Sequence, residues 1–108
     1  MRFFGLATCD TCRKALGALR AAGHMPQVID VRADGVAAAD RAAILAAFGD
    51  AAVNRASTTW RGLDAAARAA DPADLLAAHP TLMKRPVIEA DGVWYQGWGR
   101  DVQAVLLG

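Results

Sequence analysis

The sequence has only two cysteines, no long apolar run and almost no net charge. No stretch approaches the ~20 apolar residues of a membrane span, and the first residues lack the apolar core of a signal peptide. A formal net charge of +1 gives no electrostatic reason to bind nucleic acid or an anionic membrane. We therefore expect a cytoplasmic protein, and in that reducing compartment a cysteine pair is more often catalytic or redox-sensing than structural.

The length of 108 residues predicts one domain, residues 1–108, that can build a core without disulfide staples. The hydrophobic fraction of 55% is inflated by alanine, so the core has to come from the scattered Leu, Ile, Val, Phe and Trp residues. Nothing in the sequence demands association, and we expect a monomer.

The order of the expected elements is typical of a thioredoxin-like α/β fold. Residues 2–7 predict a buried strand, a helix runs from the cysteine pair to Gly23, and residues 25–31 predict a second strand. A crossover through a helix makes these two strands parallel in nearly all proteins.

Helices are expected in the middle of the chain and a hairpin after them. The middle elements are a helix at 36–48, a loop at 53–64 and two short helices at about 63–70 and 72–79. Together they predict a helical insertion over about 36–79. Strands at 86–90 and 93–96, joined by a type I′ turn at Asp91-Gly92, precede a last helix at 101–107. The plan β-α-β, helical insertion, β-β-α predicts a mixed four-stranded sheet.

Cys9 and Cys12 lie where the first strand is expected to pass into the first helix. We expect Asp10 or Thr11 to cap this helix, which places Cys9 just before the first free backbone N–H groups. The positive end of the helix and the charge of Arg13 favour a thiolate, so Cys9 is a candidate nucleophile with a lowered pKa. Cys12 follows one helical turn later, where it can close a disulfide with Cys9.

Two other uses of the cysteine pair remain open. Cysteines are often small buried hydrophobic residues, and a pair can supply half of a zinc site. Zinc needs two further ligands, and the sequence offers only His24, His79 and scattered carboxylates without a second paired spacing. We expect no metal and no resident cofactor, and we favour redox chemistry, which is typical of Cys-x-x-Cys near a β-α-β pattern.

Three stretches together resemble the arsenate reductase-like (ArsC) family, which also includes the Spx-type regulators. They are residues 9–16, residues 54–63 around Thr58-Thr59-Trp60-Arg61, and residues 83–88 around Lys84-Arg85-Pro86. The resemblance covers about residues 2–107, and it is closest to a subgroup of small proteins of unsettled activity that carry the Thr-Thr-Trp-Arg loop.

The resemblance implies which residues react. In the glutathione-linked arsenate reductases, a cysteine at the position of Cys9 attacks the oxyanion, and three arginines hold it through their guanidinium forks. Arg85 matches one of these arginines. Pro86 matches the proline that is commonly cis in thioredoxin-like folds and faces the active cysteine. We therefore expect Arg85 and Pro86 beside Cys9, with Arg13 assisting in substrate binding.

This sequence departs from the family pattern at other positions. The second and third arginines fall at Ala56, one position after Arg55, and at Trp98, two positions before Arg100. Where the glutathione-linked enzymes usually carry serine, this sequence has Cys12, which the Spx-type proteins also carry. We expect Cys12 to be the resolving thiol and Arg55 to assist in binding.

The function implied by this resemblance is that of a thiol-dependent reductase. Cys9 attacks an oxyanion such as arsenate or a mixed disulfide, Cys12 displaces the product, and glutathione with glutaredoxin, or thioredoxin, restores the thiols. The alternative is an Spx-type redox-sensing regulator that binds the α subunit of RNA polymerase and catalyses no turnover. A thiol-dependent complex with that subunit distinguishes the regulator from the enzyme.

Overall fold

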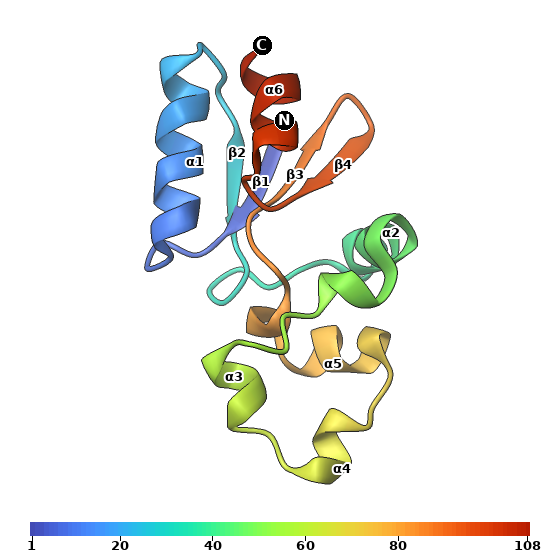
Figure 1. Ribbon diagram of the computed structural model, residues 1–108. Coiled ribbons are helices and arrows are strands. Elements are labelled where there is room, and N and C mark those ends of the chain that lie inside the picture. The colour runs from blue at the N-terminus through green and yellow to red at the C-terminus, as the bar shows by residue number, and fades with distance from the viewer. The chain divides into compact units, whose positions relative to one another are not determined.

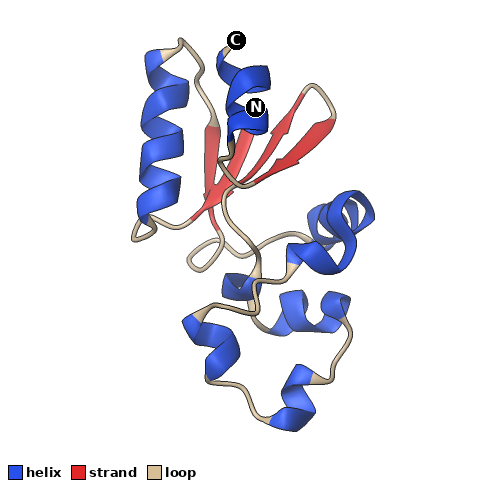
Figure 2. Cartoon of the chain, in the orientation of Figure 1, coloured by secondary structure: helices blue, strands red, loops and turns tan.

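The computed structural model describes residues 1–108 and divides the chain into two compact units (Figure 1). The first unit, Met1–Asp34 with Arg85–Gly108, contains all the strands, and the second, Gly35–Lys84, consists of helices and turns (Figure 2). The predicted helical insertion lies within the second unit. That the whole chain forms one domain stays a prediction. No helix combines the length and the apolar character that crossing a membrane requires.

The first unit is built around one sheet. Its elements are β1 (Arg2–Gly5), α1 (Asp10–Ala21), β2 (Gln27–Asp30), β3 (Val87–Ala90), β4 (Val93–Gln96) and α6 (Arg100–Leu107). The strand order is β2-β1-β3-β4, with β1 parallel to β2 and antiparallel to β3, and β3 antiparallel to β4. The predicted thioredoxin-like α/β fold with a mixed four-stranded sheet is confirmed.

The strands of this sheet are connected by a tight turn between β3 and β4 and by a helical crossover between β1 and β2. At the hairpin between β3 and β4, Asp91 has φ 52° and Gly92 has φ 79°, the two positive values that a type I′ turn requires. Between β1 and β2 the chain crosses over through α1, and the parallel register pairs Phe3 with Val28. The C-terminal ends of β1 and β2 therefore lie at the same end of the sheet, which is the end where β1 leads into α1.

Helices α1 and α6 pack together and contribute, with the sheet, to one hydrophobic cluster. Phe3 and Ile88 are partners across β1 and β3, so their side chains project from the same face. The buried members of this core cluster are Phe3, Cys12, Ala15, Leu19, Ile88, Val102 and Leu106. One of the two cysteines is therefore part of the core.

Gly5 allows α1 to lie close to the end of β1. A Cβ atom built on Gly5 would lie 2.9 Å from the Cys12 sulfur and 2.9 Å from a ring carbon of Phe3. Both distances are shorter than normal van der Waals contact, so only glycine leaves room for Cys12 at this place.

The second unit contains only short elements. They are α2 (Ala38–Phe48), a 3₁₀ turn at Gly49–Ala52, α3 (Thr58–Arg61), α4 (Ala65–Arg68), α5 (Pro72–Ala78) and a 3₁₀ turn at Pro80–Leu82. Two backbone hydrogen bonds join the middle of this unit to its last residues: Asn54 N to Leu82 O at 2.7 Å and Lys84 N to Ala52 O at 2.9 Å. Its buried apolar side chains include Ile44, Leu75, Leu76, Leu82 and Met83.

Helix α3 lies in the stretch 53–64, where the sequence predicts a loop. Ser57 caps the helix, because its Oγ accepts a hydrogen bond from Trp60 N at 3.1 Å. The guanidinium carbons of Arg55 and Arg68 lie over the Trp60 ring, 5.2 and 5.6 Å from its centroid. The predicted loop is wrong for α3, since a cap and stacked charges support this helix without an apolar period.

We expect Gly5→Ala to lower the free energy of unfolding by about 1–3 kcal/mol, because the new methyl group must displace Cys12 or Phe3. Gly17→Ala in α1 is the matched control, since nothing lies within 4 Å of a Cβ built there. That variant should gain about 0.5–1 kcal/mol, as is usual when glycine is removed from a helix. Urea unfolding followed by tryptophan fluorescence measures both. A Gly5→Ala protein as stable as the wild type would contradict the tight approach.

Candidate active site

Cys9 is the N-cap residue of α1 and has an extended backbone, with φ −88° and ψ 119°. Its N–H donates to Leu6 O at 3.1 Å, and its carbonyl accepts a helical hydrogen bond from Arg13 N at 3.0 Å. The prediction that Asp10 or Thr11 caps the helix is wrong, because no side chain caps it. Cys9 itself takes the cap position, which puts its sulfur at the free N–H groups of the first turn.

The pKa of the Cys9 thiol lies below its ordinary value. Burial raises this pKa, but four groups together lower it by more. They are the backbone N–H of Cys12, the Cys12 thiol, the positive charge of Arg85 and the backbone N–H of Thr11. Donors at a helix N-terminus and a nearby guanidinium both stabilise an anion, so Cys9 is the better thiolate of the pair.

Cys12 has the opposite character. It is 3% exposed, and burial raises the pKa of its thiol to about 11. The backbone N–H of Leu6 and the charge of Arg85 lower this pKa, whereas the hydrogen bond and the charge of Cys9 raise it. At neutral pH Cys12 therefore stays a thiol and donates a hydrogen bond to the sulfur of Cys9.

Arg85 and Pro86 lead into β3. The peptide bond between them is cis, as the resemblance implies. Pro86 is buried, and its carbonyl accepts a hydrogen bond from Gly97 N at 2.8 Å. Arg85 is half-buried, and its charge acts on both sulfurs, because it lowers the pKa of Cys9 and of Cys12. The structure thus brings together the three residues predicted to be catalytic.

Arg13 and Arg55, predicted to assist in binding, each pair with an aspartate. Arg13 pairs with Asp10 one turn earlier in α1, and both side chains are exposed. Arg55 lies in the second unit, where its guanidinium donates two hydrogen bonds to the carboxylate of Asp50, at 2.7 and 3.0 Å. To hold an anionic substrate, either guanidinium has to share or leave this partner, and both roles stay predictions.

Ala56 and Trp98 stand at the two positions where the family resemblance leads one to expect an arginine. Trp98 packs against the core cluster, and its carbonyl accepts a hydrogen bond from Gln103 Nε2 at 2.9 Å. Ala56 and Arg100 are exposed. At Trp98, an apolar ring therefore supports the core of the first unit where the glutathione-linked enzymes use a cation.

Neither His24 nor His79 belongs to a cluster of side chains that could bind a metal ion. The structure gathers no cluster of three or more His, Cys, Asp or Glu residues that could hold an ion. The ring nitrogen Nε2 of His24 lies 2.8 Å from Leu106 O in α6, and His79 ends α5 in the second unit. The cysteine pair has no further ligand group beside it in this arrangement.

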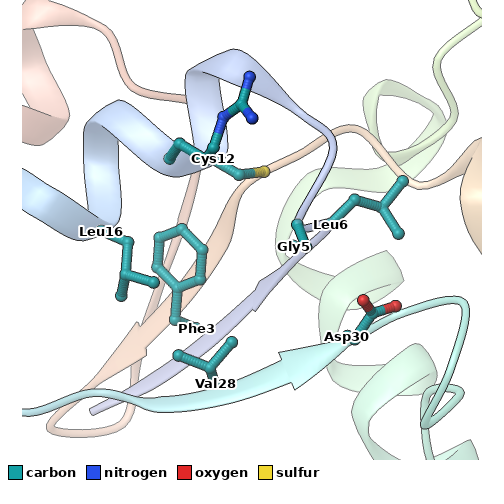
Figure 3. Close-up of a pocket in the computed structure, with 9 residues that line it drawn as sticks. Phe3, Gly5, Leu6, Cys12, Leu16, Val28 and Asp30 are labelled. Carbon is teal, nitrogen blue, oxygen red and sulfur yellow. The ribbon is translucent and has the colours of Figure 1, made fainter.

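A pocket of about 130 Å³ lies beside Cys12, and the sequence did not predict it (Figure 3). The residues that line it are Phe3, Gly5, Leu6, Ala7, Cys12, Arg13, Leu16, Val28 and Asp30. One signal for it is present in the sequence, since an isolated glycine at a strand often marks a close backbone approach. The remaining lining depends on how β1, α1 and β2 pack, which no local pattern shows.

The chain is similar in sequence and in structure to proteins of one family. A sequence model described as the ArsC family matches residues 4–102. An uncharacterized protein from Haemophilus influenzae is 37% identical over 94 residues, which are 82% of this chain and 82% of that protein. The solved YffB (PA3664) protein has a TM-score of 0.89 and 32% identity, covering 98% of this chain and 97% of its own. An arsenate reductase (ArsC) related protein from Brucella melitensis has a TM-score of 0.72 and 31% identity, covering 96% and 93%.

Replacing the charge beside the thiols gives a direct test of this site. We expect Arg85→Gln to raise the pKa of Cys9, because the thiolate loses a stabilising cation. Near neutral pH, iodoacetamide should therefore alkylate Cys9 more slowly in this variant than in the wild type. The two proteins should react at similar rates once the pH exceeds the pKa of Cys9 in each of them. Ultraviolet absorbance of the thiolate against pH measures the shift.

Arg13→Gln is the matched control for this measurement. It removes an equal charge, but that charge is exposed and paired with Asp10. Its effect on the pKa of Cys9 should be the smaller one. An equal effect of both variants would show that long-range charge, and not the position of Arg85, sets the reactivity of Cys9.

Proposed function

Because the chain belongs to the ArsC family, we propose that it is a thiol-dependent reductase with Cys9 as the nucleophile and Cys12 as the resolving thiol. The family match supports an ArsC-like thiol reductase in general. The assignment of Cys9 and Cys12 to these two roles rests on one observation. The pKa of the Cys9 thiol is lowered, and the pKa of the Cys12 thiol is raised. Such a pair supplies one thiolate for attack and keeps one thiol in reserve.

The first step is attack by the Cys9 thiolate on an oxidised substrate. With a mixed disulfide, a bond forms between Cys9 and one substrate sulfur, and the other sulfur leaves as a thiolate. With arsenate, a sulfur–arsenic bond forms and an arsenic–oxygen bond breaks, and the leaving hydroxyl takes up a proton from solvent to leave as water. In both cases the positive charge of Arg85, which already acts on both sulfurs, stabilises the negative charge of the reacting group.

The second step makes Cys12 the nucleophile. Once Cys9 is bonded to the substrate it carries no negative charge, so one of the groups that raise the pKa of Cys12 is lost. Arg85 still lowers that pKa. Cys12 then loses its proton and attacks the sulfur of Cys9, and a Cys9–Cys12 disulfide forms. The electron pair leaves with the substrate thiolate, or reduces arsenic from the +5 to the +3 state.

An external thiol then restores the enzyme. Thioredoxin can reduce the Cys9–Cys12 disulfide by exchange through its own cysteine pair, and glutathione with glutaredoxin is the other proposed donor. The two donors place different demands on Cys12. With Cys12 present, either donor reduces the Cys9–Cys12 disulfide, whereas without Cys12 glutathione has to supply the resolving thiol for Cys9.

The test is NADPH oxidation with arsenate and, separately, with a glutathione mixed disulfide as substrate. Each is supplied either with glutathione, glutaredoxin and glutathione reductase, or with thioredoxin and its reductase. We expect turnover that falls to background in Cys9→Ser, because the attacking sulfur is absent. Cys12→Ser should retain turnover with the glutathione system, because glutathione replaces the resolving thiol, and it should accumulate a mixed disulfide on Cys9, detectable by mass spectrometry.

Turnover that persists in Cys9→Ser would contradict this mechanism. Absence of turnover with either substrate and either donor would favour the Spx-type regulator. In that case a complex with the α subunit of RNA polymerase that depends on the thiol state is the expected result, and its measurement by titration calorimetry follows.

A further inference from the structure

The walls of the pocket beside Cys12 are mainly apolar (Figure 3). Phe3 lies in β1, and Leu6 directly follows that strand. Leu16 lies in α1, and Val28 lies in β2. Neither Cys9 nor Arg85 lines it. Of the three groups that perform the proposed reaction, only Cys12 lines the pocket, and all the lining residues belong to the first unit.

The two charged residues of the lining are already compensated. Arg13 forms an ion pair with Asp10 on the surface of α1. The Oδ1 atom of Asp30 accepts hydrogen bonds from the backbone N–H groups of Arg32 and Ala33, both at 2.9 Å. Both charged side chains thus already have partners, and the rest of the lining is mainly apolar, so the lining favours an uncharged molecule.

The size of the pocket limits what can occupy it. Its volume is about 130 Å³. An enclosed cavity of about 150 Å³ lined by Leu, Ile and Phe takes a benzene ring, and this pocket, although open to solvent, offers a similar volume beside mainly apolar walls. We propose that this pocket is a binding site for a small uncharged apolar molecule, either one aromatic ring or a branched aliphatic group of similar size.

Occupancy of this site has a consequence for Cys12. Cys12 is one of the lining residues, and its sulfur lies close to Gly5, which leaves room for it beside β1 (Figure 3). A bound apolar molecule lies against this sulfur and covers it from the side of the pocket. In a Cys9→Ser protein, where Cys12 is the remaining cysteine, occupancy should slow its modification by a small thiol reagent.

The experiment titrates ¹⁵N-labelled reduced protein with benzene and follows amide chemical shifts. We expect saturable shifts at the residues that line the pocket. Val28→Phe should weaken binding at least about tenfold by filling the pocket, and since Val28 is 44% exposed, the larger ring has room to be accommodated. Val93→Phe is the matched control: it makes the same change on a strand at a residue that is 51% exposed and outside this pocket, and binding should be unchanged.

Several results would overturn this proposal. They are the absence of saturable binding in the wild type, equal binding in Val28→Phe and the wild type, and tighter binding of benzoate or benzylammonium than of benzene. If Val28→Phe does not give a folded spectrum, Ala7→Phe fills the pocket from the loop before α1 and is judged by the same criterion. Unchanged modification of Cys12 in benzene-saturated Cys9→Ser protein would contradict contact with its sulfur.

Discussion

The position of Cys9 at the N-terminus of α1 is the constraint on which the proposed chemistry depends. As the N-cap residue it lies where the helix leaves backbone N–H groups free, and the N–H groups of Cys12 and Thr11 lower the pKa of its thiol. Arg85, brought to the same place by the start of β3, adds its charge to both sulfurs. Burial opposes this stabilisation, and the donors outweigh it at Cys9 but not at Cys12.

Cys12 links this reactive end of α1 to the hydrophobic core. It belongs to the cluster with Phe3 and Leu19, and it fits there because Gly5 has no side chain. The same burial that raises its pKa keeps its proton available to Cys9. One residue therefore serves packing and chemistry, so the position of α1 against β1 controls stability and reactivity together.

The sequence predicts elements with local signals well and misses those that depend on distant partners. The hairpin follows from alternation and from Asp91-Gly92, and α1 follows from its apolar period. Helix α3 was missed because its support is a capping oxygen from Ser57 and guanidinium groups over Trp60, neither of which leaves a period. The proximity of Arg85 to the cysteines was expected only from the resemblance to a family, since periodicity does not show which loops meet. The pocket needs three elements to pack and therefore required the structure.

The most direct test of the central claim is a pH titration of the reduced protein with ¹³Cβ-labelled cysteine, followed by NMR. We predict that Cys9 ionises first, with a pKa below the ordinary value of a thiol, and that Cys12 ionises with a pKa of about 11. Ionisation of Cys12 before Cys9, or of both near the ordinary value, would contradict the assignment of Cys9 as the attacking thiolate.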